Sequence, residues 1–140
     1  MSKVKNINNN DPKNQNFAIE TPEHGLIGTI NLVDIDWKNR NAFSGVSLGN
    51  KDTRGKGYAL DAVMTIMRYA FDELGLARLD GDMIATNKVS INFFKKRCGW
   101  EVEGIKKNWF FRKGGFHDKV VVGITAERYK EFLAENAQKE

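Results

Sequence analysis

The chain has 140 residues, enough to bury one hydrophobic core, and its 41% hydrophobic and 29% charged residues are close to globular averages. The formal net charge of +4 is compatible with an anionic ligand, and no apolar run approaches the roughly 20 residues of a membrane span. The single cysteine, Cys98, excludes an internal disulfide and a cysteine-rich metal site. We therefore expect a soluble protein of the reducing cytoplasm, with Cys98 as a small buried residue.

The first elements along the chain read as an arm followed by strands. Residues 1–16 are rich in Asn and Lys, so we expect a disordered arm or an expression remnant, with one domain over 17–140. The segments 17–20 and 26–35 alternate like strands around a turn at 22–25, and a third strand is expected over 42–49.

The segment K-D-T-R-G-K-G-Y-A, residues 51–59, lies between that third strand and a periodic helix. Apolar residues recur at helical spacing from Leu60 to Leu74, and Gly75 is expected to end the helix. Glycines at a helix N-terminus leave backbone N–H groups open, and the helix dipole favours an anion there. From these residues alone, an anion cradle and an ordinary tight connection are about equally supported. Two familiar phosphate-binding motifs do not match this segment. A dinucleotide fingerprint needs a third glycine, and a Walker loop needs a Ser or Thr after Lys56.

The second half predicts a strand over 78–85 and a short helix over 90–98 that Gly99 closes. A strand over 100–112 should pair with 119–125 across a turn at 113–115, and 126–136 should form the last helix. Within this hairpin, Trp109, Phe110 and Phe111 lie among basic residues. They could stack on nucleic-acid bases, but their position in a strand favours core packing.

Three separated motifs resemble the GNAT superfamily of acetyl-CoA-dependent N-acetyltransferases. Arg54-x-x-Gly57-x-Ala59 is similar to its pyrophosphate signature, and the segment from Asn87 to Trp100 is similar to its N-x-x-A/S-I-x-x-Y-x-K-x-G-F element. Glu103-Gly104 and Gly115-x-x-Asp118 resemble its E-G and G-x-x-D elements. The similarity runs from about Phe17 to Tyr129 and is greatest to the branch of ribosomal-protein alanine and spermidine acetyltransferases.

The resemblance implies an α+β fold in which a twisted, mixed and mostly antiparallel sheet is flanked by helices and splays open at the cofactor. Full-length relatives carry one more strand and a helix pair ahead of the segment that begins at Phe17, and we expect these elements to be absent here. Either the chain is a shortened form completed by a partner subunit, or its N-terminal region is lacking. The uncovered strand edge at Phe17 and the uncovered apolar surface of the sheet then predict a homodimer or larger assembly.

The implied activity is direct transfer of the acetyl group of acetyl-CoA to a primary amine, either a small molecule or a protein N-terminus. The resemblance places the thioester and pantetheine on backbone groups of Ser47, Leu48 and Gly49. The pantetheine arm would also contact Asn87 and Phe94, and Lys96 would reach the adenosine phosphate. The pyrophosphate would bind residues Arg54, Gly55, Lys56, Gly57, Tyr58 and Ala59.

Two departures leave the catalytic residues unassigned. The tyrosine that many relatives use as general acid is Phe94 here, and Phe43 stands where close relatives often carry a glutamate. The weak candidates are Asp34 and Asp36, which should share one strand face, and Ser90, whose first-turn position suits a helix cap. His117 and His24 fall in expected loops and are weaker still, and no residues have metal-ligand spacing.

Two alternative functions stay open at this point. A CoA-binding module with little or no catalysis could act as a sensor or interaction protein. A basic nucleic-acid-binding domain is less favoured, because cofactor phosphates account better for the basic residues.

Overall fold

The computed structural model describes residues 3–7, 11–49 and 51–138. Contacts divide the chain into two compact units, Met1–Ala77 and Arg78–Glu140, called the first and second unit below. Within the described residues, no helix combines the length and the apolar character that crossing a membrane requires.

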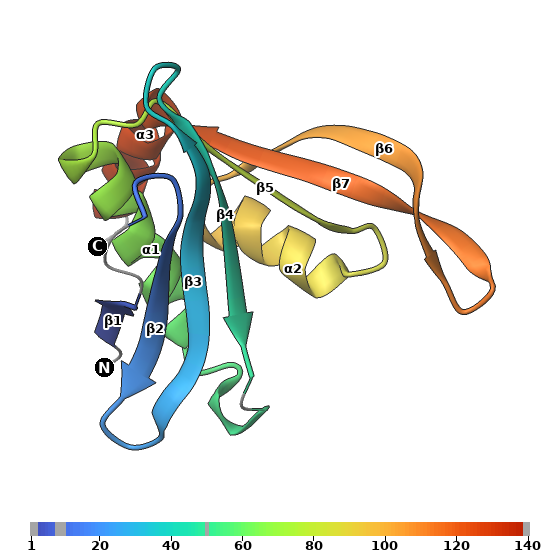
Figure 1. The fold of residues 1–140 in the computed structure, drawn as a ribbon, viewed down its shortest axis with the longest axis horizontal. Helices are drawn as coiled ribbons and strands as arrows, with labels where there is room; N and C mark the ends of the chain where they lie inside the picture. Colours follow the sequence, from blue (N-terminus) through green and yellow to red (C-terminus); the bar gives the residue numbers. More distant parts are fainter. Residues whose placement is uncertain (1–2, 8–10, 50, 139–140) are drawn as a thin grey trace. The chain divides into compact units, whose positions relative to one another are not determined.

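The first unit is built on four strands, β1 (Lys3–Asn6), β2 (Gln15–Thr21), β3 (Gly25–Asp36) and β4 (Asn41–Leu48), each antiparallel to the next (Figure 1). Alternation along β2 and β3 brings apolar side chains to one face, where Ile19, Ile30 and Leu32 are at most 1% exposed. The strand predictions over 17–20, 26–35 and 42–49 are thus confirmed, with ends shifted by one to two residues.

The N-terminal arm is partly ordered, which corrects the expectation of disorder over 1–16. β1 pairs with β2 from Lys3 opposite Glu20 to Asn6 opposite Phe17, and Lys5 Nζ lies 3.0 Å from Glu20 Oε2. Residues 1–2 and 8–10 lie outside the described residues. The arm forms a strand because main-chain pairing to an open edge needs few apolar side chains. The edge at Phe17 is therefore covered by β1, and the part of the homodimer prediction that rested on that edge no longer holds.

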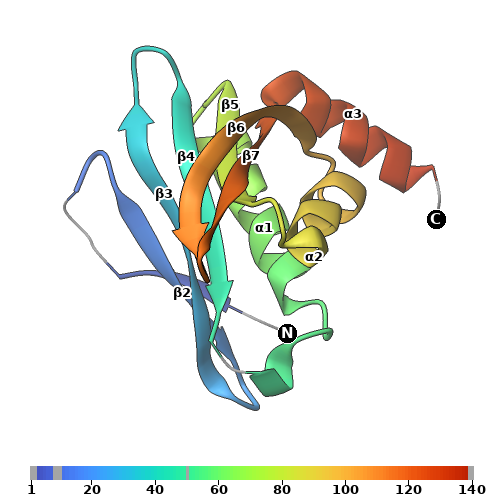
Figure 2. The same ribbon diagram turned by 90° about the vertical axis from the view of Figure 1, so that its right-hand side faces the viewer.

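One helix, α1 (Tyr58–Arg68), covers one face of these strands (Figures 1 and 2). Its buried residues follow helical spacing and are Ala62, Val63, Ile66 and Met67. A wider, π-helical turn over Tyr69–Glu73 extends it, with the Leu74 N–H bonded to the Tyr69 carbonyl, and Gly75 ends it at φ +69°. The Tyr69 ring packs edge-on to Phe17, 5.7 Å between centroids, and so joins the helix to β2.

The second unit places β7 (Gly115–Thr125) between β5 (Arg78–Ile84) and β6 (Glu101–Arg112), all antiparallel. Short helix α2 (Lys88–Asn92) continues in a π-helical turn over Phe93–Arg97, and α3 (Ala126–Ala137) packs on β7. The unit's core contains Leu79, Cys98, Val122 and Ile124, each at most 2% exposed, and Tyr129 at 4%. Burial also raises the pKa of the Cys98 thiol to about 12.

A large bulge interrupts β6. Lys106 pairs with Lys119 and Phe110 with His117, so three β6 residues stand opposite Asp118 alone. Asn108 adopts φ +53° in this bulge, and its N–H donates to Asp118 Oδ1 at 3.0 Å. His117 and Asp118 accordingly lie in β7, which begins at Gly115, and the expectation that the strand begins at 119 is wrong. A carboxylate that bonds the bulge lets pairing continue to the end of the hairpin.

We predict that Asp118→Ala lowers the free energy of unfolding by about 1 kcal/mol, because the Asn108 N–H loses its acceptor. Asp118→Asn retains a side-chain oxygen and should stay close to wild type. Guanidinium unfolding followed by circular dichroism measures both. Equal stability of the alanine and asparagine variants would show that this bond does not hold the bulge.

Candidate functional site

The segment that joins β4 to α1 is anchored at one end and open at the other. A turn of 3₁₀ helix over Lys51–Thr53 puts the Thr53 side chain at 0% exposure, whereas residues 54–57 are all exposed. Gly55 and Gly57 have φ of +77° and +82°, a backbone conformation that other residues rarely adopt. These two glycines turn the chain sharply into the helix.

The N-terminus of α1 has the backbone chemistry of an anion site. Gly57 is its N-cap, and no side chain caps the helix there. The first bond inside the helix runs from the Asp61 N–H to the Gly57 carbonyl at 3.0 Å, and helix geometry leaves the N–H groups of residues 58–60 without acceptors inside the helix. A Cβ built on Gly55 or Gly57 meets nothing within 4 Å. The approach to these N–H groups is therefore open, and exposed Arg54 and Lys56 add positive charge.

The end of β4 offers fewer backbone donors than expected. The Gly49 N–H donates to the Ile27 carbonyl at 2.9 Å, so that group is already used by β3. In an antiparallel ladder, the N–H groups of successive residues point to opposite edges, so the Leu48 N–H points away from β3. Of the predicted positions Ser47, Leu48 and Gly49, Leu48 therefore has the backbone direction that an additional ligand needs.

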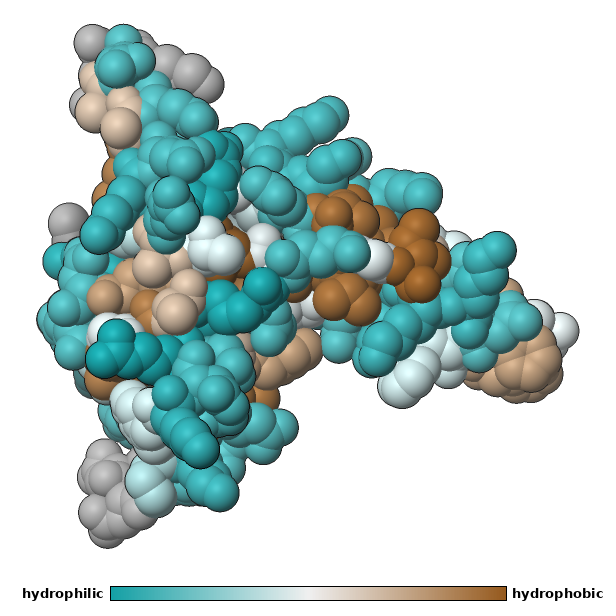
Figure 3. Space-filling view, turned by 90° about the horizontal axis from the view of Figure 1, so that it is seen from above, coloured by the Kyte–Doolittle hydropathy of each residue, from teal (hydrophilic) through white to brown (hydrophobic). Residues whose placement is uncertain are grey.

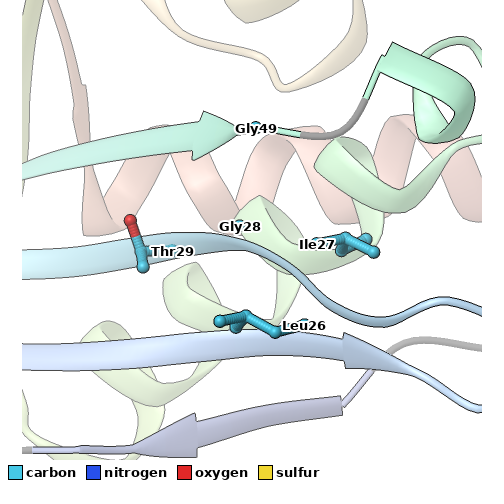
Figure 4. Close-up of a pocket in the computed structure, with 5 residues that line it drawn as sticks. All are labelled: Leu26, Ile27, Gly28, Thr29 and Gly49. Atoms are coloured by element: carbon cyan, nitrogen blue, oxygen red, sulfur yellow. The ribbon is translucent and has the colours of Figure 1, made fainter.

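An open depression of ≈360 Å³ lies beside this strand end, and sequence reasoning did not find it (Figure 4). Its lining residues are Leu26, Ile27, Gly28, Thr29 and Gly49. A Cβ on Gly28 would lie 2.1 Å from the Ser47 carbonyl oxygen, so only glycine lets β3 approach β4 this closely. One feature of the sequence marks this place, namely a glycine inside an alternating strand; the structure adds that the neighbouring Leu26 is 64% exposed.

The predicted residues of the second unit gather around α2. Asn87 caps the helix, since its Oδ1 accepts from the Ser90 N–H at 3.1 Å. The amide nitrogen of Asn87 keeps the donor capacity that a pantetheine arm could use. Lys96 is exposed in the last turn, where a cation also suits the helix dipole. Helix capping and the helix dipole therefore give Asn87 and Lys96 a structural role beside the ligand-binding role that the family motif implies.

Phe94 belongs to a buried aromatic cluster. Its ring lies 5.2 Å from the Phe93 ring and 4.9 Å from the Trp100 ring, centroid to centroid, and the residue is 8% exposed. Two neighbouring rings therefore fix the plane and position of Phe94. A phenyl ring has no proton to donate, so it can offer a ligand only an apolar edge.

One of the two candidate carboxylates at the end of β3, that of Asp36, accepts hydrogen bonds from the local backbone. Asp36 Oδ1 accepts from the N–H groups of Lys38 and Asn39, and Asp36 Oδ2 accepts from the Asn39 side chain. The bonds from Asn39 hold the pKa of Asp36 below its ordinary value, which makes it a poorer proton acceptor. Asp34 has a φ of +52° and lies beside a break in the β3–β4 register. The regular alternation of side chains is interrupted there, so it no longer puts Asp34 and Asp36 on one strand face, contrary to expectation.

Two residues of the family-like motifs also have structural partners. Glu103 forms an ion pair with Arg78, whose guanidinium also lies 2.7 Å from Asp80 Oδ1. A Cβ on Gly123 would meet both Arg78 and Glu103 at 2.2 Å, so the glycine makes room for this pair. Asp118 bonds the β6 bulge, as described above. Among the described residues, no three His, Cys, Asp or Glu side chains gather closely enough to hold a metal ion.

The predicted site residues thus divide between the units. The structure brings together Ser47 to Ala59 around the β4–α1 connection of the first unit, with residue 50 outside the described part. It brings together Asn87, Ser90, Phe94 and Lys96 around α2 of the second unit. Asp34 and Asp36 stand apart from the β4–α1 connection, at the end of β3 where it turns into β4.

Comparison with known proteins identifies the relatives of the chain. The SPbeta prophage-derived uncharacterized N-acetyltransferase YokL of Bacillus subtilis is 28% identical over 114 residues, which are 81% of this chain and 63% of YokL. The Spermidine N(1)-acetyltransferase of Vibrio cholerae is 24% identical over 119 residues, 85% of this chain and 68% of that protein. The chain therefore spans less than two thirds of the length of YokL.

A crystal structure of spermidine N-acetyltransferase from Vibrio cholerae in complex with CoA and spermine has a TM-score of 0.79 at 24% identity, over 86% of this chain and 70% of that chain. This likeness confirms the predicted fold class. A family model for the acetyltransferase (GNAT) domain matches residues 2–101. Since that match covers more than half of the sequence, the chain belongs to the acetyltransferase (GNAT) family.

Proposed function

We propose that the chain binds acetyl-CoA and transfers its acetyl group to a primary amine. The observation that carries the proposal is the open, uncapped N-terminus of α1 behind the left-handed Gly55 and Gly57. These residues fit a pyrophosphate, because bare N–H groups and the helix dipole favour an anion there. Family membership supports the same ligand.

The residues around the site have separable tasks in this proposal. The N–H groups of residues 55–59 would hold the phosphates, and the Leu48 N–H and Asn87 would orient the thioester arm. Acetyl-CoA supplies the acyl group as a thioester. The amine must lose a proton before it attacks, and the engaged Asp36 carboxylate is a poor base for that step. The general base is therefore left unassigned.

We propose a small-molecule amine as the acceptor, with a protein N-terminus as the alternative. The support is that one relative is named a spermidine acetyltransferase and one solved neighbour contains spermine.

The cytoplasmic location and the homodimer remain predictions. The single cysteine favours the first, and the covered edge at β2 removes one of the two reasons for the second.

Release of free CoA thiol in the presence of an amine panel tests the proposed activity. We expect release that depends on both acetyl-CoA and an amine, with spermidine, spermine, an amino sugar and a peptide N-terminus as acceptors. Cys98 will contribute little background, because its thiol is buried and its pKa is about 12. Binding of acetyl-CoA without release under any acceptor would instead support the CoA-binding module.

For the cradle, we predict that Gly57→Val weakens acetyl-CoA binding at least about tenfold, roughly 1.4 kcal/mol, because a branched side chain enters the ligand's volume. Gly75→Val is the matched control: Gly75 ends the same helix with φ +69° and equally open surroundings, so it carries the same backbone strain. Titration calorimetry compares the two. Equal affinities of both folded variants would place the cofactor elsewhere.

For the leaving group, we predict that Phe94→Tyr raises turnover by up to about 10²-fold where thiolate departure limits the rate, because the new hydroxyl can donate a proton. Phe93→Tyr adds the same hydroxyl to the neighbouring ring and should leave turnover unchanged. Steady-state rates with a working acceptor give the comparison. A crystal structure with the CoA sulfur far from residue 94 would refute the assignment.

A further inference from the structure

The far part of the β6–β7 hairpin stands outside the sheet of the second unit. Pairing between β5 and β7 ends where Ile84 meets Lys119, whereas β6 and β7 remain paired to Arg112 and Gly115. Residues 105–119, called the distal ribbon here, therefore include a two-stranded stretch without a third strand (Figure 1). Such a stretch has no layer of its own to cover its side chains.

Three aromatic side chains of the distal ribbon are exposed. Trp109 is 55% exposed, Phe111 65% and Phe116 63%, and the rings of Phe111 and Phe116 meet edge to face at 5.0 Å between centroids. The expectation that Trp109 and Phe111 pack in the core is therefore wrong, and only the neighbouring Phe110 is half-buried. Exposed apolar groups concentrated in one place commonly mark an interaction site.

The distal ribbon also carries a net positive charge equal to that of the whole chain. Its basic residues are Lys106, Lys107, Arg112, Lys113 and Lys119, and its one acidic residue is Asp118. Five positive charges and one negative charge give +4, the formal charge of all 140 residues, so the other residues sum to zero. Figure 3 shows hydrophilic and hydrophobic atoms side by side over the hairpin. The surface therefore suits an anionic partner that also presents flat apolar faces.

The Trp109 ring is held in place on this surface. Lys119 Nζ lies 3.8 Å from its centroid, and the same nitrogen lies 3.5 Å from Asp82 Oδ2. The Lys119 side chain is only 13% exposed, so it acts as a fixed support on the ring. The bond from Asn108 to Asp118 fixes the backbone of the bulge that presents Trp109. A ring positioned in this way loses little freedom when a ligand stacks on it.

The edge of β6 is poorly suited to receive another strand. Its register with β7 shifts between Val102 and Gly104 and again between Lys106 and Phe110, with lysines at the second shift. Bulges and lysines are the devices by which natural sheets prevent edge pairing. A second copy of the chain would in addition bring two surfaces of charge +4 together. Both features favour a partner that binds through stacking and charge.

We propose that the distal ribbon binds single-stranded nucleic acid. Trp109, Phe111 and Phe116 stack on unpaired bases, while the exposed cations Lys106, Lys107, Arg112 and Lys113 contact the phosphates. Aromatic side chains among basic residues on a strand pair are the arrangement that single strands bind without sequence preference. The inference is independent of acetyl transfer, since it uses no residue of the α1 cradle or of the α2 cluster.

Fluorescence anisotropy of labelled oligonucleotides tests the proposal on the full chain. The probes are oligo-dT and oligo-U of about 12 nucleotides, within the usual site sizes, and a DNA duplex of the same length. We expect both single strands to bind more tightly than the duplex. Phe111→Ala and Phe116→Ala should each lower affinity about tenfold, and the control Trp37→Ala, which removes a 44% exposed indole from the first unit, should not.

Salt dependence tests the charges separately. With four phosphates contacted, the logarithm of affinity should fall with the logarithm of salt at a slope of about −3 between about 50 and 200 mM, and Lys106→Ala with Lys107→Ala should reduce that slope by about 1.4. Lys130→Ala, on α3, is the control. A difference in affinity between oligo-dT and oligo-U identifies DNA or RNA as the natural ligand. Similar affinities show that the ribbon recognises the bases and phosphates that both nucleic acids share.

Several results would overturn the proposal. The first is that the wild-type chain binds neither single strand, and the second is that it binds the duplex and the single strands equally well. The third is that a double variant with both Phe111→Ala and Phe116→Ala keeps full affinity. Sedimentation adds the fourth: a dimer that these substitutions abolish, together with absent oligonucleotide binding, would assign the surface to a second copy of the chain.

Discussion

The packing of α1 on the strands of the first unit determines where the proposed anion site lies. The apolar stripe from Ala62 to Met67 is buried on the strands, and fully buried Thr53 fixes the turn that precedes the helix. At the other end, the Tyr69 hydroxyl donates to Gln15 Oε1 at 2.9 Å. Contacts at both ends hold the helix on the strands, and its first N–H groups, which have no acceptor inside the helix, point out of its N-terminus. Binding an anion there costs little ordering, because the donors already point outward.

A different constraint shapes the second unit, namely the bulge of β6. A regular strand would continue the period-two alternation and place every second side chain on the core side. The three residues opposite Asp118, of which Trp109 is the last, interrupt that alternation, and regular pairing resumes at Phe110. Trp109 is therefore presented by the bulge itself, whereas Phe111 and Phe116 are exposed in the paired stretch that β5 does not accompany. Without the bond between Asn108 and Asp118, little else among the described contacts would compensate for the unpaired backbone of this segment.

Features that depend on local pattern were predictable from the sequence, whereas features that depend on a partner strand were not. The period of Val63, Met67 and Ala70 indicates α1, and the glycine spacing at 55 and 57 indicates a turn into it. The pairing of β1 leaves no such pattern, because it is made by main-chain groups that every residue carries. The same holds for the Gly49 N–H, which is engaged by Ile27, and for the bulge that exposes Trp109.

The two kinds of proposed site differ in what they require of the sequence. The cradle is made mostly of backbone groups, so its sequence signature consists of glycines whose positive φ and missing Cβ leave those groups open. The recognition of an amine acceptor depends on particular side chains, and one of the two carboxylates that the sequence offered at the end of β3, that of Asp36, accepts bonds from the backbone N–H groups of Lys38 and Asn39 instead. Backbone sites can therefore be recognised from spacing, whereas side-chain sites require the contacts of each residue. That difference explains why the cofactor can be proposed with named residues while the general base cannot.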